Sequence, residues 1–311
     1  MSMRFIFHLG CGCFALLLLA CDTSSDLPLL AGNTRAVTGE GDALYQQAKQ
    51  ADDSGKAKQA IKLYDQTATR YSFANPAAQA RFRQAELLEQ TGEPVKAFDA
   101  YQLFLTRFQA SNLYTAALAN QAKIAHSAAD GRVKSSFLGI RSKLEVKKVA
   151  EMLGQVRDNA PKTPTAAKAQ FTIGDLYQHE HEFALSIANY RQLVRDQPDC
   201  AEAPEALFRV GVVFTDEARL GNRNQATLEL AREAFNDYLN QYPGHSRNAE
   251  AHKLIQNLSN HELQNTFDIA EYYYKTGQLE SAKVYYRDVM KRAQSGQLHA
   301  ASRARLKQLG E

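Results

Sequence analysis

Proline, glycine, cysteine and long apolar runs are all scarce in this sequence of 311 residues. With 8 Pro and 17 Gly, the chain is neither collagen-like nor disordered throughout. The 37 basic and 34 acidic residues leave a formal net charge of only +3, which gives no reason to expect a polyanionic partner such as nucleic acid. Only one apolar run, close to the start, is long enough to raise the question of a membrane. We therefore expect a soluble body with a special N-terminal segment.

The first 20 residues have the pattern of an export signal. Arg4 precedes a sixteen-residue apolar stretch, Phe5 to Ala20, whereas a helix that spans a membrane needs about 20 residues. The sequence predicts that residues 1–20 are removed as a signal peptide. Leu18-Leu19-Ala20-Cys21 resembles the lipobox of bacterial lipoproteins, in which the cysteine is joined to diacylglycerol before cleavage. The resemblance implies that Cys21 is lipidated and becomes the N-terminus. A plain secretory signal followed by a chance cysteine is the alternative.

A lipid anchor at Cys21 would hold the body at the periplasmic face of a bacterial membrane. Asp22 resembles the signal that retains lipoproteins in the inner membrane of enteric bacteria, so the choice of membrane stays open, with the outer membrane favoured. Residues 21–41 are rich in Ser, Thr, Gly and Asp without a period, and we expect them to form a lipidated, flexible tether. After cleavage Cys200 is the only other cysteine. No intrachain disulfide is therefore expected.

Internal repetition is the strongest signal in the chain. A displacement of 37 residues relates two copies of one pattern: Gly55, Ala60 and Tyr64 against Gly92, Ala97 and Tyr101. A third copy contains Gly174, Tyr190 and Pro198. These offsets resemble the tetratricopeptide repeat, in which a small residue lets the first helix of a pair approach the second, a large apolar residue fills the space between them, and proline ends the second helix. The sequence therefore predicts an all-α solenoid.

We expect about six helix pairs over residues 42–295, wound into a right-handed superhelix, and a C-terminal capping helix over 296–311. The small residue recurs as Ala48, Ala85, Ala119, Gly174, Gly211 and Ala270, and the large anchor of the second helix as Tyr64, Tyr101, Leu153, Tyr190, Phe235 and Tyr286. Irregular gaps between anchors indicate insertions at 130–142 and 217–227. Ser186 stands where the fourth repeat should have alanine. No alternating strand pattern is found, so strands are not expected.

The last third of the chain carries a more specific resemblance. Residues 231–238, 242–246 and 269–273 are similar to the BamD family, the tetratricopeptide lipoproteins of the outer-membrane β-barrel assembly machinery. The resemblance implies a non-enzymatic scaffold whose early repeats receive unfolded outer-membrane proteins and whose later repeats dock on the barrel-assembly subunit. The alternative is a cell-envelope scaffold for division or peptidoglycan machinery.

The sequence contains no recognisable catalytic or metal-binding motif. His179 and His181 in His179-Glu180-His181-Glu182 are two residues apart, so on a helix they would point about 200° away from each other. The segment His261 to Asn265 has asparagine where a zinc-protease motif needs its second histidine. No phosphate loop, nucleophile elbow or dinucleotide fingerprint occurs. We expect no enzymatic activity, no catalytic residue, no metal and no cofactor.

Protein partners are expected in the groove that the first helices of the repeats form. The groove positions of this repeat select an aromatic and charged set: Tyr45, Lys49, Phe82, Glu86, Gln90, Phe267, Glu271 and Tyr274. Rigid aromatics among hydrogen-bonding groups are typical of peptide recognition. The alternative for Tyr45, Phe82 and Phe267 is packing against the adjacent repeat. A basic stretch, residues 132–148, is either a solvated insertion or a contact for a partner or for lipid headgroups.

Overall fold

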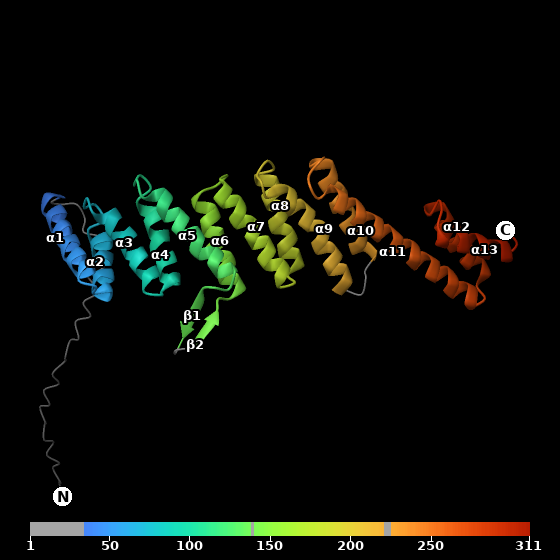
Figure 1. Ribbon diagram of the computed structural model, residues 1–311, viewed down its shortest axis with the longest axis horizontal. Helices are drawn as coiled ribbons and strands as arrows, with labels where there is room; N and C mark the ends of the chain where they lie inside the picture. Colours follow the sequence, from blue (N-terminus) through green and yellow to red (C-terminus); the bar gives the residue numbers. More distant parts are fainter. Residues whose placement is uncertain (1–33, 138–139, 221–224) are drawn as a thin grey trace, which may run out of the picture. The chain divides into compact units, whose positions relative to one another are not determined.

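The computed structural model describes residues 34–137, 140–220 and 225–311 (Figure 1). The predicted signal peptide, Cys21 and the first part of the predicted tether lie outside the described residues. The described residues form two compact units, divided between Thr91 and Gly92. Over residues 34–91 the first unit contains three helices, α1 (Thr34–Asp53), α2 (Ala57–Arg70) and α3 (Ala77–Gln90).

The second unit is also a succession of helices, interrupted by one short hairpin. Its elements are α4 (Pro94–Arg107), α5 (Tyr114–Ala129), β1 (Lys134–Phe137), β2 (Ile140–Lys143), α6 (Val146–Asn159), α7 (Pro164–His179), α8 (Phe183–Asp196), α9 (Ala203–Leu220), α10 (Gln225–Gln241), α11 (Asn248–Lys275), α12 (Leu279–Arg292) and α13 (Gln297–Gln308). From α5 onward, each helix of this unit packs against the one before it (Figure 1). The fold class is that predicted: all-α, built from helix pairs of the tetratricopeptide type.

In the first unit, α1 begins earlier than the sequence suggested. The helix starts at Thr34, so part of the predicted tether of residues 21–41 is helical. Gly41 explains why α1 can pack here: a Cβ atom at this position would lie 2.6 Å from Ala74 Cβ and 2.9 Å from Tyr71 Cβ. The Tyr71 hydroxyl donates to Glu40 Oε2 at 3.2 Å. Close packing of this backbone on the turn after α2 fixes the helix where composition alone indicated a linker.

The predicted anchors of the second helices are all buried. Exposure is 2% for Tyr64 and 0% for the other five anchors, Tyr101, Leu153, Tyr190, Phe235 and Tyr286. Two of them press directly on a glycine of the first helix. A Cβ atom on Gly174 would lie 2.5 Å from Tyr190 Cε1, and one on Gly211 would lie 2.6 Å from Phe235 Cε1. The small and large residues of the repeat therefore meet as the packing argument requires.

One small residue was assigned wrongly. Ala119 is exposed, and the inner face of α5 is instead formed by Ala117, Ala122 and Ala125. Four of the other repeats place the small residue 16 positions before its anchor. Ala125 precedes Leu153 by 28, which leaves room for a long insertion between the two helices. The insertion had displaced the repeat pattern in the sequence.

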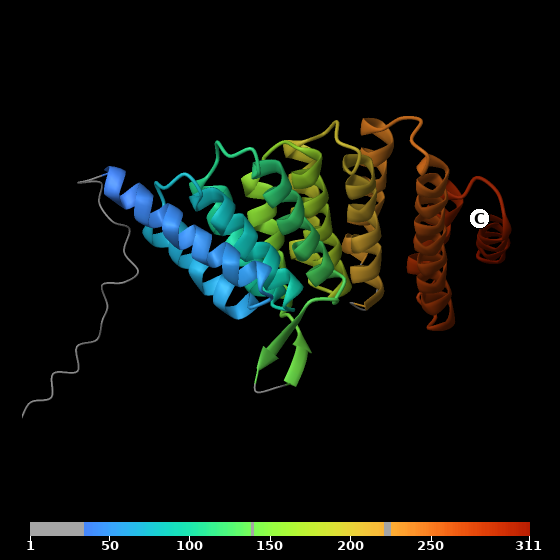
Figure 2. The same cartoon turned by 60° about the vertical axis from the view of Figure 1, so that its left-hand side comes forward.

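That insertion is a β-hairpin, although no strands were expected. β1 and β2 pair antiparallel, with Lys134 opposite Lys143 and Phe137 opposite Ile140, and the hairpin projects from the helices of its unit (Figure 2). Two four-residue strands are too short to produce a recognisable alternation. The second predicted insertion, 217–227, differs in kind, since α9 continues to Leu220 and α10 begins at Gln225. Of the helices in the described ranges, none is long and apolar enough to cross a bilayer.

Candidate protein-binding groove

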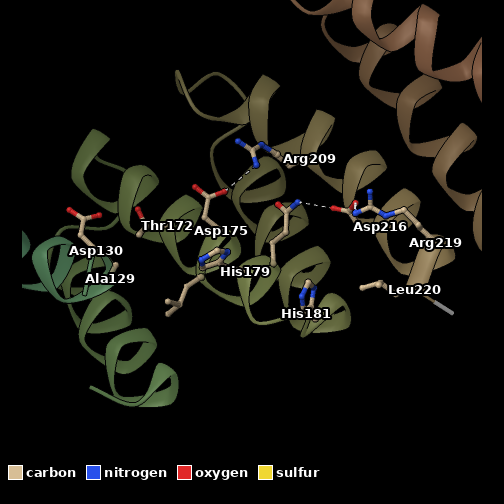
Figure 3. Close-up of a pocket in the computed structure, with 12 residues that line it drawn as sticks. Ala129, Asp130, Thr172, Asp175, His179, His181, Arg209, Asp216, Arg219 and Leu220 are labelled. Atoms are coloured by element: carbon tan, nitrogen blue, oxygen red, sulfur yellow. Dashed lines mark hydrogen bonds and ion pairs between the residues drawn. The ribbon is translucent and has the colours of Figure 1, made fainter. Parts of the chain in front are cut away.

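A pocket of about 550 Å³ lies among the first helices of three successive pairs, α5, α7 and α9 (Figure 3). Its lining mixes apolar and polar surface and carries charged side chains of both signs. The lining residues are Ala129, Asp130, Thr172, Asp175, Leu176, Gln178, His179, His181, Arg209, Asp216, Arg219 and Leu220. This is the inner side of the repeat array, where the repeat pattern predicted binding.

The helical period explains why these side chains converge. Asp175, Gln178 and His179 are three and four residues apart, so they share one face of α7. Gly174, immediately before them, is pressed against Tyr190 of α8, whose hydroxyl reaches Asp175 and Gln178 on that face. On α9, Arg209 and Asp216 are seven residues apart and so lie two turns apart on one face. The packing of the buried anchor therefore directs polar side chains of both helices into the pocket.

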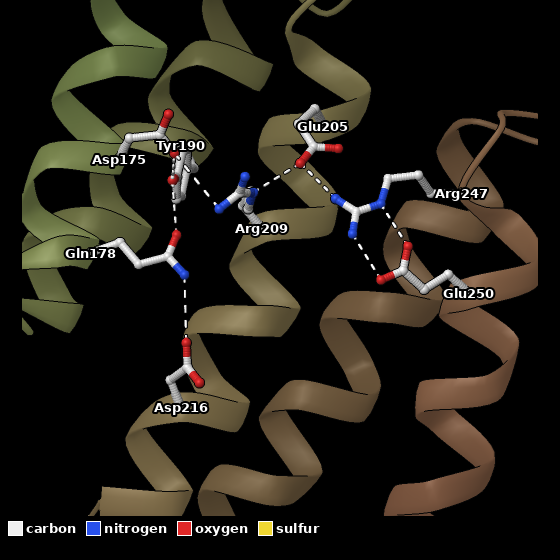
Figure 4. A network of polar contacts seen from close by, with 8 residues as sticks. All are labelled: Asp175, Gln178, Tyr190, Glu205, Arg209, Asp216, Arg247 and Glu250. Carbon is white, nitrogen blue, oxygen red and sulfur yellow. Dashed lines mark hydrogen bonds and ion pairs between the residues drawn. The ribbon is translucent and has the colours of Figure 1, made fainter. Parts of the chain in front are cut away.

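The buried anchor of its own repeat, Tyr190, fixes the position of Asp175 through a hydrogen bond (Figure 4). The Tyr190 hydroxyl donates to Asp175 Oδ1 at 2.5 Å, and Gln178 Oε1 lies 3.0 Å from the same hydroxyl. Burial raises the pKa of Asp175, and the hydrogen bond from Tyr190 partly offsets that rise. Burial and the neighbouring Asp175 raise the pKa of Tyr190 well above its usual range. The tyrosine is therefore a fixed hydrogen-bond donor that sets the position of the carboxylate.

A chain of ion pairs continues from the pocket across α9 to α11 (Figure 4). Arg209 Nε donates to Glu205 Oε1 at 2.8 Å, and Arg247 Nη1 donates to the same oxygen at 2.6 Å. Arg247 also makes two hydrogen bonds of 2.8 Å to Glu250. Its guanidinium lies 3.7 Å from the centroid of the Phe208 ring. Glu205 is thus shared by two arginines, and this fixes one end of Arg209.

The Tyr190 and Asp175 pair belongs to a contact that recurs in other repeats. In two of them the anchor tyrosine donates to a carboxylate of the first helix, and an arginine from the first helix that follows binds the same carboxylate. One set is Tyr64, Asp52 and Arg83, with 2.7 Å between Arg83 Nε and Asp52 Oδ2. The other is Tyr286, Glu271 and Arg305, with 2.8 Å between Arg305 Nε and Glu271 Oε1. In both sets the arginine bonds both carboxylate oxygens. These contacts tie neighbouring helix pairs together.

At the pocket this contact is open. Arg209 Nη1 lies 3.9 Å from Asp175 Oδ1, too far for a hydrogen bond. Within the described residues, Arg209 makes its hydrogen bond through Nε to Glu205. Its terminal nitrogens make none, and Nη1 has only the 3.9 Å ion pair with Asp175. A guanidinium held at one end and free at the other is suited to bind carbonyl or carboxylate oxygens of another molecule. The middle of the array is therefore the part that offers free recognition groups.

His126 of α5 contacts Thr172, a residue that lines the pocket, and makes stability depend on pH. Its Nδ1 is 3.3 Å from Thr172 Oγ1, and burial is the main cause that lowers its pKa, with nearby Lys168 contributing. Because the folded state disfavours the charged imidazole, the unfolded chain binds the proton more strongly. Stability is therefore expected to be fully present above the ordinary pKa of histidine, about 6.5, and to fall as the pH is lowered below it.

The expected result is that His126→Gln loses this part of the pH dependence. Urea unfolding of the parent and the variant from pH 5 to pH 8 should give stabilities whose difference changes across that window, with the parent losing more on acidification. Gln297→Ala, at an exposed residue of α13 that does not titrate, is the control and should run parallel to the parent. If the parent and His126→Gln run parallel, the low pKa of His126 is wrong.

Of the predicted groove residues in the first unit, two are free of packing roles. Lys49 and Gln90 are exposed. Tyr45 packs against the buried cluster around Tyr64, with ring centroids 5.7 Å apart, and Phe82 is half-buried. Glu86 accepts a hydrogen bond from Arg83 at 2.9 Å.

The predicted residues of α11 are occupied by contacts within the second unit. Phe267 packs on Tyr286, the anchor of its own repeat, with ring centroids 5.8 Å apart, whereas the alternative had been packing on the adjacent repeat. Glu271 accepts from Tyr286 and Arg305, and the Arg305 guanidinium lies 4.5 Å from the centroid of the Tyr274 ring. Glu271 and Tyr274 are thus brought together by one arginine, in a contact that joins α11 to α13.

The sequence did not predict this pocket, because groove residues were selected only in the first, second and sixth repeats. The same positions applied to the fourth repeat select Asp175, Gln178 and His179. Arg209 lies outside those positions, and nothing in the sequence indicated it. His179 and His181, interpreted as a solvated helix end, are exposed and line the pocket. Across the described residues no group of three or more His, Cys, Asp or Glu could hold a metal ion.

Comparisons with known proteins add little to this picture. No family model matches the chain. No curated protein matches it either. Among solved structures, MamA (41-end) from Desulfovibrio magneticus RS-1 is 14% identical, with 67% of this chain and 99% of that chain covered and a TM-score of 0.31. The apo form of RapI is 14% identical over 85% and 75%, with a TM-score of 0.35. PilF of Pseudomonas aeruginosa is 13% identical over 86% and 99%, with a TM-score of 0.31. What this chain binds therefore has to be argued from its own residues.

Proposed function

We propose that this protein is a non-enzymatic scaffold that binds extended segments of other proteins in the pocket formed by α5, α7 and α9. The observation that carries the proposal is the open contact at Arg209. Two other repeats close this contact with a bidentate ion pair, whereas at the pocket Arg209 and Asp175 form an ion pair of 3.9 Å without a hydrogen bond. Arg209 and Asp175 together offer a donor and an acceptor, which is what the peptide groups of an extended chain require.

We further propose that the scaffold is anchored by lipid at Cys21 on the periplasmic face of a bacterial membrane, with the outer membrane favoured over the inner. The support is the sequence of residues 18–21, which resembles a lipobox. The partners proposed are the barrel-assembly subunit and unfolded outer-membrane proteins. That part of the proposal rests on the similarity of residues 231–238, 242–246 and 269–273 to the BamD family.

Photocrosslinking tests the pocket and the partner together. A photoreactive residue replaces Arg219, which lines the pocket and has a side chain that is 74% exposed. After illumination of intact cells, the protein is purified from detergent-solubilised envelopes. The expected product is a crosslink to the barrel-assembly subunit or to an unfolded outer-membrane protein. His179→Glu, at an exposed pocket residue, should reduce the yield about tenfold, the effect of about 1.4 kcal/mol.

Two controls separate the parts of the proposal. The photoreactive residue at exposed Arg303 of α13 should give no such crosslink, and Cys21→Ser should leave the membrane fraction. Equal crosslinking from both positions would show that the pocket is not the binding site. Recovery of division or wall proteins alone would replace the barrel-assembly role by the other envelope role, and membrane retention of Cys21→Ser would rule out the lipid anchor.

A further inference from the structure

A second pocket, of about 420 Å³, lies between α10, α11 and α12 of the second unit. It is separate from the groove, and its lining residues are Glu229, Arg232, Ser259, Glu262, Leu263 and Arg292. The long helix α11 passes here from one hydrophobic cluster to another. Leu258 belongs to the cluster shared with α9 and α10, and Ala270 belongs to the cluster shared with α12 and α13. Between these two residues, α11 presents a buried carboxyl group in place of an apolar side chain.

Glu262 is that group, and half of its hydrogen-bonding capacity is unused. Its side chain is only 4% exposed, and Oε2 accepts from Arg292 Nη2 at 2.7 Å. Oε1 is fully buried and accepts no hydrogen bond from a donor group within the described part of the chain. Besides Arg292, Glu262 has a hydrogen-bond contact only with the Glu229 carboxyl group, which requires a proton shared between the two. When both carboxyl groups are ionised, the buried acceptor is unsatisfied, which is destabilising. A side chain of this kind is retained most simply where a donor arrives from outside.

The charges around Glu262 define that donor. Glu229 of α10 faces it and is paired with Arg232. Arg292 of α12 binds Glu262 and lies 3.6 Å from Asp288. Among the described residues, the ion pairs of Glu229, Glu262 and Asp288 are with Arg232 and Arg292, so these five groups carry one negative charge in excess when all are ionised. Burial, followed by the charge of Glu229, raises the pKa of Glu262, since the two carboxylates oppose each other's ionisation.

We propose that this pocket binds the primary ammonium group of a lysine side chain from a partner polypeptide, which donates to Glu262 Oε1 and to Glu229. An ammonium supplies the missing donor and the missing positive charge in one group. Leu263 lines the same pocket and gives an apolar wall for the methylene stem of a lysine. A metal ion would need further carboxylate or imidazole ligands, which the described residues do not bring together here. The site is formed by α10, α11 and α12 and shares no lining residue with the groove proposed above, so it does not depend on that proposal.

The test uses the full chain in detergent micelles and the peptide N-acetyl-Ala-Lys-Ala-amide as the probe. Carbon-13 NMR of glutamate carboxyl groups reports on Glu262. The peptide is expected to shift the Glu262 resonance saturably, while the same peptide with Nε-acetyl-lysine does not. Binding requires the ionised carboxylate, so the affinity should rise with pH as Glu262 loses its proton. Glu262→Gln should weaken binding at least tenfold.

Glu280→Gln is the matched control. Glu280, on α12, is also a carboxylate paired with a cation, but its side chain is 83% exposed. It should bind the peptide as the parent does. Equal shifts from the lysine and acetyl-lysine peptides, which require no variant, would overturn the proposal. So would a Glu262 titration that is identical with and without the lysine peptide, since the carboxyl pair would then be satisfied by a proton alone.

Discussion

Gly211→Ala is expected to destabilise the protein by about 1–3 kcal/mol, although alanine favours a helix over glycine by about 1 kcal/mol. The added Cβ would lie 2.6 Å from Cε1, 2.7 Å from Cδ1 and 2.8 Å from Cζ of Phe235. Real Cβ atoms do not approach ring carbons so closely, and Phe235 cannot move aside because it is completely buried. The helices α9 and α10 must therefore separate. The free energy of unfolding in urea measures the effect.

Gly154→Ala provides the comparison, since Gly154 also lies inside a helix, α6. A Cβ atom there would meet only Arg157 Nη2, at 3.8 Å. This variant should be more stable than the parent by up to about 1 kcal/mol. Phe235→Leu, which removes the crowded ring edge, should recover part of the loss when combined with Gly211→Ala. A stabilising effect of alanine at both positions would show that the contact between α9 and α10 is looser than the structure has it.

The repeats were predictable from sequence because their packing imposes residue size at fixed spacing. A small residue on the first helix and a large one 16 positions later must meet, so Ala48 with Tyr64 and Gly174 with Tyr190 appear as a pattern along the chain. Ser186, which departs from that pattern, is completely buried, and its hydroxyl donates to the Gly174 carbonyl at 2.9 Å. A buried serine is tolerated here because the backbone of the first helix satisfies it.

The hairpin and the exposed Ala119 show where such a pattern stops. An insertion between two helices is free of the packing constraint, and a pair of four-residue strands leaves too short a signal to be read. The small residue expected at Ala119 is therefore exposed, and the buried alanines of α5 are Ala117, Ala122, Ala125 and Ala128.

The binding groove could be predicted as a face but not as a site. Helical spacing gives the residues that look inward, including Asp175 and Gln178. Whether such a residue is free depends on distances between helices. Glu271 is closed by Arg305 at 2.8 Å, whereas Asp175 is left open by Arg209 at 3.9 Å. The distance between arginine and carboxylate thus differs by about one ångström between these repeats, and this difference decides whether the pair is hydrogen-bonded. The residue types are similar in both repeats, so the sequence does not reveal it.

Phe208→Ala is expected to have the largest effect on stability, a loss of about 4 kcal/mol. Phe208 is completely buried, and its ring centroid lies 5.3 Å from that of Phe235 and 5.4 Å from that of Tyr238. The Arg247 guanidinium covers its face at 3.7 Å. The substitution therefore removes two aromatic pairs and the surface that supports Arg247, in addition to opening a cavity. Unfolding in urea measures the loss.

Phe73→Ala is the matched control, because the Phe73 side chain is 73% exposed, and it should change stability by less than about 0.5 kcal/mol. In a repeat array each helix pair is stabilised mainly by its neighbours. Hydrogen exchange of Phe208→Ala should therefore accelerate most in α8 to α11, where the cluster lies, and least in α13. Uniform acceleration along the whole second unit would mean that its helices unfold as one cooperative body. The ion pairs that link Glu205, Arg247 and Glu250 would then contribute to the stability of the whole unit.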